Sequence, residues 1–326
     1  MKILVTGGAG YIGSFMVKRL LDDGNDVVVA DSLECGHESV LDNRAAFVKG
    51  SLLDKNYLKN LFTDHQFDGV IHFAGYISVA ESTIKPELYF TNNFLATLNL
   101  LEQMVESHVL NIIFSSTAAV YGTPQHVPIP ENHPKKPESP YGDSKLMVET
   151  LLHWYHTAHT INSVALRYFN ASGAMLDGSM GEMHDPETHI IPNAIKAVIE
   201  GKQFTLFGTD YPTKDGTAVR DYIHVLDLAE AHILALRKIS KDGGEYTFNV
   251  GTGMGYSNQE VINMVEKVSK KKIEIHVESR RSGDPVELVA DVDKIKKELG
   301  FKPLHSELET IVESAWKWHS KQDNHA

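Results

Sequence analysis

The chain opens on Lys2-Ile3-Leu4-Val5-Thr6-Gly7-Gly8-Ala9-Gly10-Tyr11-Ile12-Gly13, a short apolar run followed by a cluster of glycines. The apolar run predicts a β-strand, and apolar residues at helical spacing in 11–23 predict a helix directly after the glycines. Glycine allows the tight turn and the close backbone approach that a strand–turn–helix unit needs to hold a pyrophosphate. Gly7, Gly10 and Gly13, with Tyr11 and Ile12 at the helix N-terminus, are therefore predicted to bind a dinucleotide.

One acidic residue indicates which dinucleotide is bound. Asp31 follows Gly13 by 18 residues, at the end of the second predicted strand, 27–30. A carboxylate at this place accepts hydrogen bonds from the ribose hydroxyls of adenosine and repels a 2′-phosphate. The sequence therefore predicts NAD rather than NADP as the cofactor.

Short apolar runs alternate with amphipathic stretches through the first 173 residues. Continuous apolar strands separated by helices indicate a parallel sheet that is covered on both faces. Right-handed crossovers between the strands make this a Rossmann-type, doubly wound α/β fold. The predicted strands are 2–6, 27–30, 46–48, 69–73, 110–115 and 163–169, and the predicted helices are 11–23, 58–64, 86–107 and 141–159.

The pattern loosens after Gly173, because 174–189 is poor in large apolar residues and contains several glycines and prolines. The helices and strands beyond it predict a smaller C-terminal lobe that binds the substrate, with the chain crossing between the two bodies more than once. The expected division is a NAD-binding domain of residues 1–173, to which segments around 218–255 return, and a substrate-binding lobe of residues 174–217 and 256–326.

Composition narrows the choice of partners and compartment. The 326 residues carry 43 acidic and 31 basic side chains, a net charge of −12, which argues against nucleic acid or an anionic membrane as the main partner. No apolar run approaches the ~20 residues of a membrane helix, so no membrane association is expected. The single cysteine, Cys35, fits a reducing compartment, which predicts a cytoplasmic protein. His153, His156 and His159 fan around one helix instead of converging, and no metal site is predicted.

A Tyr-x-x-x-Lys motif, from Tyr141 to Lys145, lies at the start of the predicted helix 141–159. Chance alone gives about one such pair in a chain of this composition, so the motif is informative only through its position. Residues four apart share a helix face, which places the Lys145 ammonium beside the Tyr141 phenol. The hydroxyls of Ser115 and Thr117 follow the fifth strand, at the sheet edge where ligands of α/β proteins bind. A phenol whose pKa is lowered by a neighbouring cation and an oxidised nicotinamide ring is a base suited to hydride-transfer chemistry.

Further motifs are distributed over the chain. They are 7–13 (GGAGYIG), 70–75 (VIHFAG), 115–122 (SSTAAVYG), 139–142 (SPYG), 166–170 (LRYFN), 208–213 (GTDYPT), 215–225 (DGTAVRDYIHV) and 280–285 (RRSGDP). On these motifs the chain resembles the extended short-chain dehydrogenase/reductase family, and within it the UDP-glucose 4-epimerases. The resemblance covers essentially the whole chain, and 208–225 is its most specific part.

The resemblance implies an isomerase that interconverts UDP-glucose and UDP-galactose by transient oxidation at C4, rotation of the 4-keto sugar and re-reduction, with NAD kept as a prosthetic group. Tyr141 would take the proton of the 4-hydroxyl, and Thr117 would relay it. Lys145 would lower the pKa of the tyrosine and hold the nicotinamide ribose. The resemblance also implies a homodimer that pairs through the helices 86–107 and 141–159.

The resemblance further implies which residues line the two ligands. Besides the glycine loop and Asp31, those at the cofactor are Ser51, Leu52, Phe73, Ala74, Gly75, Asn92, Ser115, Tyr141, Lys145 and Tyr168. Those at the UDP-sugar are Thr117, Tyr141, Asn170, His189, Arg220, Arg281, Asp284 and Leu288, with the two arginines as clamps on the diphosphate.

Departures from the family pattern leave alternatives open. Ser51 stands where relatives carry an aspartate that contacts adenine. Leu288 stands where relatives carry a tyrosine or something smaller at the sugar, so epimerisation of UDP-N-acetylglucosamine, pentoses or uronates, or a dual specificity, stays possible. A 4,6-dehydratase or another nucleotide-sugar oxidoreductase is disfavoured, because Ala118-Ala119 stands where dehydratases place an acidic pair. A non-catalytic NAD-sensing protein is also disfavoured, because such proteins lack the tyrosine–lysine pair.

Overall fold

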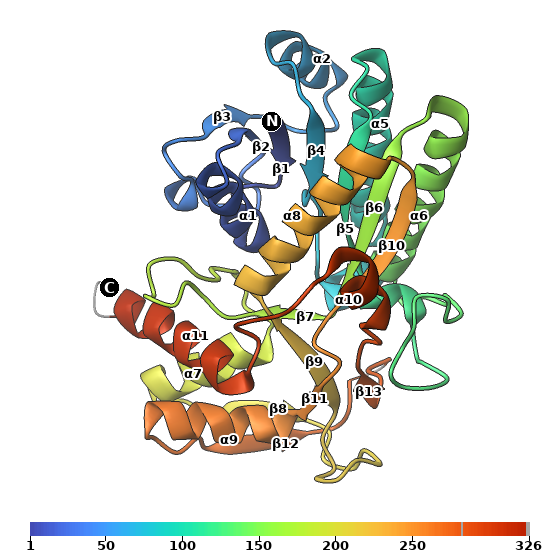
Figure 1. Cartoon of the computed structure of the whole chain (residues 1–326). Helices are drawn as coiled ribbons and strands as arrows, with labels where there is room; N and C mark the ends of the chain where they lie inside the picture. The colour runs from blue at the N-terminus through green and yellow to red at the C-terminus, as the bar shows by residue number, and fades with distance from the viewer. Residues whose placement is uncertain (282, 324–326) are drawn as a thin grey trace.

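The main body is a parallel sheet of seven strands in the order β10-β6-β5-β4-β1-β2-β3 (Figure 1). The computed structural model describes residues 1–281 and 283–323. The strands are β1 (Lys2–Thr6), β2 (Asp26–Asp31), β3 (Ala46–Lys49), β4 (Gly69–His72), β5 (Asn111–Thr117), β6 (Asn162–Tyr168) and β10 (Glu245–Val250). Every pairing in this sheet is parallel, as buried apolar strands separated by helices predict.

Helices cover both faces of the sheet, so the doubly wound fold is confirmed. Successive side chains of β1 enter different cores: Ile3 and Val5 pack on one face and Leu4 packs on the other. The helices that pack on the first face are α1 (Tyr11–Asp22), α8 (Val225–Asp242) and α10 (Asp293–Leu299). Those on the second face are α2 (Lys55–Asp64), α5 (Ala96–Glu106) and α6 (Pro140–His159).

The predicted helix 86–107 is interrupted. It consists of α4 (Pro86–Tyr89), a π-helical turn (Phe90–Leu95) and α5. Within the turn, Asn93 exchanges two hydrogen bonds with the backbone of Tyr76, at 2.8 and 3.0 Å, and its carbonyl accepts a bond from the hydroxyl of Thr97. The turn therefore places an inward-facing amide next to the loop after β4, which a regular helix would not do.

The C-terminal lobe has two small sheets and a core of its own. One sheet joins β7 (Asn170–Ser172), β9 (Val219–His224), β11 (Gly255–Ser257) and β13 (Glu287–Leu288), and the other joins β8 (Phe204–Phe207) and β12 (Ile275–Glu278). The lobe helices are α7 (Ile190–Glu200), α9 (Asn258–Ser269) and α11 (Leu308–Asp323), and they pack on one another around a third core. The remaining short helices are η1 (Glu38–Val40), α3 (Val79–Ile84) and η3 (Ala118–Tyr121).

Three segments lie elsewhere than the expected domain division places them: β7 and β9, expected in the NAD-binding domain, pair in the small sheet of the lobe, and α10, expected in the lobe, packs on the main body. Residues 256–326 were all assigned to the lobe, but α10 packs against β10 and α8 of the main sheet. Val292, Ile295 and Phe301 belong to the same buried core as Phe248 of β10. The chain thus returns to the NAD-binding body a second time, because these three apolar side chains fill the flank of the last strand.

Candidate active site

The glycine loop joins β1 to α1 at the point where the strand order of the sheet reverses. Gly7 has a φ of +70°, and a Cβ on it would lie 2.5 Å from the amide nitrogen of Ala74; a Cβ on Gly13 would lie 2.2 Å from the carbonyl oxygen of Gly7. A Cβ on Gly10 would instead meet only that oxygen, at 3.3 Å, among the described atoms. Gly7 and Gly13 are therefore required by packing, whereas Gly10 leaves open space at the helix N-terminus.

The N-terminus of α1 is free to bind an anion. Its N-cap, Gly10, offers no side-chain cap, and the first turn holds no acidic residue. Uncapped N–H groups and the positive end of the helix dipole favour a phosphate at this place. The residues present thus fit the pyrophosphate of a dinucleotide.

Asp31 lies at the end of β2 beside the glycine loop. Its Oδ2 accepts a hydrogen bond from the N–H of Ala9 at 2.9 Å, and its Oδ1 accepts one from Leu33 at 2.8 Å. Each carboxylate oxygen keeps a further acceptor position, so the oriented side chain can still bind ribose hydroxyls. Ser51 follows β3 in the same corner, where the N–H of Gly50 donates to Asp31 O and the Ser51 hydroxyl accepts from Leu53.

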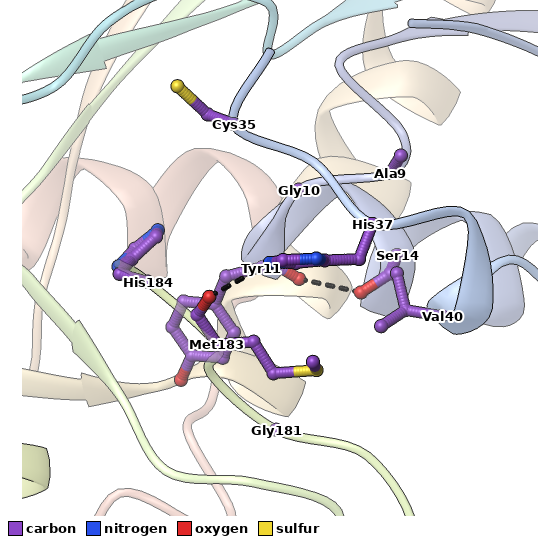
Figure 2. A pocket seen from close by; sticks show the side chains of 10 residues that line it. All are labelled: Ala9, Gly10, Tyr11, Ser14, Cys35, His37, Val40, Gly181, Met183 and His184. Atoms are coloured by element: carbon purple, nitrogen blue, oxygen red, sulfur yellow. Dashed lines mark hydrogen bonds between the residues drawn. The ribbon is translucent and has the colours of Figure 1, made fainter. Parts of the chain in front are cut away.

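A small pocket lies between the glycine loop and a loop of the C-terminal lobe, 181–184 (Figure 2). Tyr11 reaches across it, since its hydroxyl donates to the carbonyl of Gly173 at 2.6 Å. The ring of His37 donates from Nε2 to the carbonyl of Met183 at 3.0 Å. The pocket therefore joins the cofactor loop to the lobe that the sequence assigns to the substrate.

Lys145 is buried on α6 and reaches the sheet edge. Its Nζ donates to the carbonyl of Ser115 at 2.8 Å, and burial lowers its pKa to about 8. A Cβ on Gly75 would lie 3.6 Å from this nitrogen and 3.0 Å from the side-chain oxygen of Asn93. The fold thus brings together Lys145, Ser115, Gly75 and Asn93 from four separate segments. The sequence assigns the first three of these residues to the cofactor.

Tyr141 lies one turn before Lys145, and its phenol faces the hydroxyl of Thr117. The Thr117 oxygen also accepts the N–H of Ala119 at 3.1 Å, which leaves its proton to donate to the phenol. Burial raises the pKa of Tyr141, and the hydrogen bond from Thr117 opposes that rise. The protein alone therefore does not lower the pKa of Tyr141. The lowering that the sequence predicts also depends on the oxidised nicotinamide ring of the cofactor.

Tyr168 lies beside this site, at the end of β6, and its donor role is fixed by a histidine. His232 bonds the carbonyl of Leu228 through Nδ1 at 2.8 Å, so its Nε2 is an acceptor and the Tyr168 hydroxyl donates to it. Burial lowers the pKa of His232 to about 4, which keeps the ring neutral. Burial raises the pKa of Tyr168, and the neighbouring Ser115 opposes that rise.

Six of the residues predicted to bind the UDP-sugar lie in the lobe, in two groups, whereas Thr117 and Tyr141 lie at the edge of the main sheet. Arg220 of β9 pairs with the carboxylate of Asp284 and donates to Pro285 O at 2.8 Å. Leu288 lies directly beside Arg220, because β13 pairs with β9 at these two positions. Asn170 is on β7, which pairs with β9 on the other side. Asn170, Arg220 and Leu288 therefore share one small sheet, and Asp284 lies just before its strand β13.

The guanidinium of Arg281 lies apart from the Arg220–Asp284 ion pair, 4.0 Å over the ring of Phe207. A guanidinium stacked on a ring keeps its N–H donors directed outward in its plane, where a phosphate or carbonyl can accept them. Ser282, part of the same family motif, lies outside the described residues.

His189 forms the second group, together with Glu182. It is the N-cap of α7, and its Nδ1 hydrogen-bonds the buried carboxylate of Glu182. Burial opposes protonation, but the carboxylates of Glu182 and Glu187 prevail and raise the pKa of His189 to about 9. At neutral pH its imidazole therefore carries a positive charge.

Several residues at the site have no counterpart in the sequence prediction. Asn93 makes the hydrogen bonds at the loop after β4, one position beyond the predicted Asn92, and it also bonds Ser144 at 3.3 Å. In the sequence, the neighbouring Asn92 is the signal that points to the position of Asn93. His232 and Glu182 gave no signal, because a histidine on an apolar helix face is typical of a core and a loop glutamate is typical of a surface.

A dinucleotide-binding sheet that carries a tyrosine–lysine helix beside its switch point is the arrangement of the short-chain dehydrogenase/reductases, and fold and site place the chain in that class. Residues 3–251 match the NAD dependent epimerase/dehydratase family, and the chain belongs to this family.

Known relatives extend over the full chain. A UDP-glucose 4-epimerase of Lacticaseibacillus casei is 47% identical over 326 residues, which is 100% of this chain and 98% of the relative. A crystal structure of a UDP-glucose 4-epimerase superposes with a TM-score of 0.96 at 44% identity, covering 99% of both chains. The UDP-glucose 4-epimerase from Bifidobacterium longum in complex with NAD+ and UDP superposes with a TM-score of 0.95 at 38% identity, also over 99% of both chains. The resemblance read from the motifs is thus confirmed.

Proposed function

We propose that this chain interconverts UDP-glucose and UDP-galactose by NAD-dependent 4-epimerisation. The observation that carries the proposal is the buried tyrosine–lysine pair of α6, where Tyr141 faces Thr117 and Lys145 donates to the carbonyl of Ser115 at the edge of the sheet that holds the glycine loop. The hydroxyls of Tyr141 and Thr117 can each donate and accept a proton, as removal of the proton of the sugar 4-hydroxyl requires. The full-length relatives with the same activity support it.

Held by the glycine loop and Asp31, NAD would supply the hydride acceptor and donor for C4 of the sugar. Tyr141 takes the proton of the 4-hydroxyl, and Thr117 donates to the phenol oxygen and so stabilises its charged form. Lys145, held by Ser115 O, adds a positive charge close to the same edge. The burial that raises the pKa of the phenol also excludes water, which strengthens these charge interactions.

The lobe residues fit the diphosphate part of the substrate. Arg220 is buried and oriented by Asp284, so its charge is fixed in place before a ligand arrives. Arg281 on its aromatic support adds a further cationic donor. A chain whose net charge is −12 needs such local cations to bind a dianionic pyrophosphate.

A labelling experiment tests this function directly. Purified protein is incubated with UDP-galactose that carries deuterium at C4, without added NAD, and the products are separated by chromatography. Because the same hydride leaves and returns, UDP-glucose should form with the deuterium retained at C4. Loss of the label to solvent, or the formation of a dehydrated 4-keto product, would refute the mechanism.

The size of Leu288 leads to a prediction on substrate choice. Leucine is smaller than tyrosine by most of a ring, so we expect good activity on the two hexoses and weaker activity on the N-acetylated pair. Leu288→Tyr should remove the N-acetyl activity and spare the hexose reaction, because a mismatch with a rigid pocket costs ~1–3 kcal/mol, roughly tenfold or more. The kcat/KM values for both substrate pairs measure this effect.

Leu288→Ile, which keeps the volume, is the matched control and should leave the ratio of the two kcat/KM values unchanged. A ratio that also stays unchanged in Leu288→Tyr would place this residue away from the sugar. In that case the epimerase proposal would still stand.

We further propose a homodimer that pairs through α6 and the neighbouring π-helical turn. Leu95, Met147 and Trp154 expose large apolar side chains there, and the Trp154 side chain is 61% exposed. Met147 and Trp154 are seven positions apart and so share one stripe of α6. Burying such a stripe against its own copy removes apolar area from water.

Trp154→Glu should convert the dimer to a monomer, because it would bury a charge at the centre of the interface. Light scattering at micromolar concentration measures the mass. Leu304→Glu, at a 78% exposed leucine in the lobe, is the control and should remain dimeric. A wild-type monomer, or a dimeric Trp154→Glu, would contradict this interface.

Two features of the chain bear on the cellular compartment of the protein. No helix in the described part of the chain is long and apolar enough to span a membrane. Cys35, the one cysteine of the sequence, is exposed. We propose a cytoplasmic location, which fits a thiol that needs no disulfide partner.

A further inference from the structure

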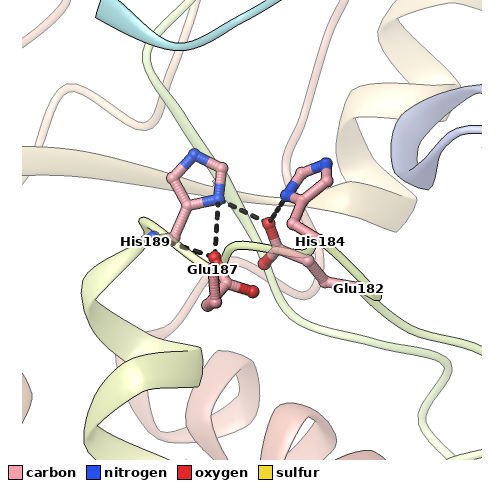
Figure 3. Close-up of side chains that lie close together, drawn as sticks. All are labelled: Glu182, His184, Glu187 and His189. Atoms are coloured by element: carbon pink, nitrogen blue, oxygen red, sulfur yellow. Dashed lines mark hydrogen bonds and ion pairs between the residues drawn. The ribbon is translucent and has the colours of Figure 1, made fainter. Parts of the chain in front are cut away.

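Four metal-ligating side chains converge at the junction of the lobe with the glycine loop (Figure 3). They come from the segment 182–189, in the pattern Glu182-x-His184-x-x-Glu187-x-His189. One ligand atom from each of the four lies within 4.8 Å of the other three. The side chains of Glu182 and Glu187 are only 4% and 3% exposed, so both carboxylates are held out of water.

The hydrogen bonds within this cluster are incomplete. Among the described residues, the buried Oε2 of Glu187 accepts no hydrogen bond, and the buried Nδ1 of His184 makes none either, although it lies 2.7 Å from Oε1 of Glu182 as an ion pair. Leaving a buried donor or acceptor unpaired costs about 1–3 kcal/mol, and more for a charged group. Both unpaired atoms are of the types that bind metals, and both belong to the same cluster.

The distances also fit one ion. Nδ1 of His184 lies 2.7 Å from Oε1 of Glu182, and Nδ1 of His189 lies 3.8 Å from Oε1 of Glu187. Ligand bonds of about 2.1 Å in a tetrahedral zinc site separate neighbouring ligand atoms by about 3.4 Å. Small side-chain shifts would therefore make all four atoms equidistant from one centre.

The surrounding chain holds the segment in place from both sides. From α11, the indole of Trp318 donates to the carbonyl of Glu182 at 2.9 Å, and a Cβ on Gly181 would lie 2.5 Å from that ring. From α7, the amide of Asn193 donates to the carbonyl of Glu187 at 3.2 Å. The ring of His184 packs edge-on against Tyr11 of the glycine loop.

We propose that Glu182, His184, Glu187 and His189 form a binding site for a divalent transition-metal ion of the zinc class. Two imidazoles and two carboxylates suit Zn²⁺, whereas Mg²⁺ and Ca²⁺ select all-oxygen sites. Four protein ligands make this a closed, structural site. The ion would fasten the lobe segment to the loop that holds the cofactor, and Nε2 of His189, which points away from the cluster, stays available to a ligand (Figure 3).

The experiment measures metal directly in the NAD-loaded protein. After dialysis against a chelator, the protein is titrated with Zn²⁺ in competition with a chromophoric zinc indicator, and with Co²⁺ in a parallel absorbance titration. We expect one ion per chain, a visible Co²⁺ spectrum of the four-coordinate type that Zn²⁺ displaces, and no competition from Mg²⁺. Thermal unfolding should shift upward on addition of Zn²⁺.

Two variants locate the ion. Glu187→Gln and His184→Asn should each weaken Zn²⁺ binding at least about tenfold, since loss of even an outer-shell partner costs 10–100-fold. The matched control is His153→Asn, which removes a histidine from another pair, 2.9 Å from Glu245 on the surface. If Glu187→Gln fails to fold, His184→Asn decides, because its ring lies at the edge of the cluster with 22% exposure.

Other outcomes would overturn the proposal. Binding of less than one Zn²⁺ per wild-type chain, or equal affinity in the wild type, His184→Asn and the control, would mean that the cluster is a buried ion-pair network only. None of these measurements uses catalytic activity, so the result is independent of the proposed epimerisation.

Discussion

Tyr141→Phe lowers the turnover of UDP-galactose by about 10²–10⁴-fold, the range expected for loss of a general acid–base group. The substitution removes one oxygen from a ring that packs edge-on against Tyr89 at 6.4 Å, so the packing of α6 is preserved. Thr117 keeps its bond from the N–H of Ala119 and loses only its phenol partner. The measurement is kcat under saturating substrate, with bound NAD quantified in the same preparation.

Tyr155→Phe is the matched control, because Tyr155 lies on the same helix and is partly buried. It should turn over substrate like the wild type. Near-normal turnover in Tyr141→Phe, with NAD bound, would eliminate this tyrosine as the base. A loss of NAD together with the loss of turnover would show that the phenol acts mainly in binding the cofactor.

The parallel sheet could be predicted from sequence because its signal is local. Runs such as Ile3-Leu4-Val5 must be buried on both faces, and only a sheet between two helix layers offers that. The glycine loop was predictable for the same reason, since Gly7 and Gly13 are required by contacts within one strand–turn–helix unit. His72, the last residue of β4, is hydrogen-bonded on both ring nitrogens, to Thr6 and Thr97, which is typical of a core histidine.

Other features depend on contacts between distant segments, and the sequence carries little trace of them. The π-helical turn has an ordinary helical composition, and its distinguishing bonds run from Asn93 to Tyr76, 17 residues earlier. The packing of α10 on β10 joins residues about fifty positions apart. The raised pKa of Tyr141 comes from burial by the assembled site, which no spacing of tyrosine and lysine reveals.

The cluster of Glu182, His184, Glu187 and His189 is another feature that the sequence pattern does not reveal. His153, His156 and His159 lie at regular helical spacing on α6, where each side chain points a different way. His153 pairs instead with Glu245. The four ligating residues of 182–189 converge only because Trp318 and the glycine loop fix an irregular segment from two sides.

Gly10→Ala should separate cofactor binding from folding. In the protein alone the added Cβ meets only the carbonyl of Gly7, at 3.3 Å, so the substitution costs about 1 kcal/mol of stability for the loss of a favourable N-cap residue. The same methyl occupies the space through which a pyrophosphate approaches the N–H groups of α1. An overlap of this kind costs ~1–3 kcal/mol, which corresponds to a dissociation constant for NAD that is roughly ten to a hundred times larger.

Two companion variants make this result decisive. Gly69→Ala, in β4 of the same sheet, adds a methyl with ordinary contacts from 3.4 Å outward and should keep its NAD. Gly13→Ala should fail to fold, because its Cβ would lie 2.2 Å from the oxygen of Gly7 and 2.8 Å from the Cα of Gly8, and backbone cannot give way there. Circular dichroism reports the fold, and nucleotide released on denaturation reports the cofactor. A Gly10→Ala protein that is folded and still fully loaded with NAD would show that the pyrophosphate does not lie against this glycine, and the cofactor would have to enter the sheet edge elsewhere.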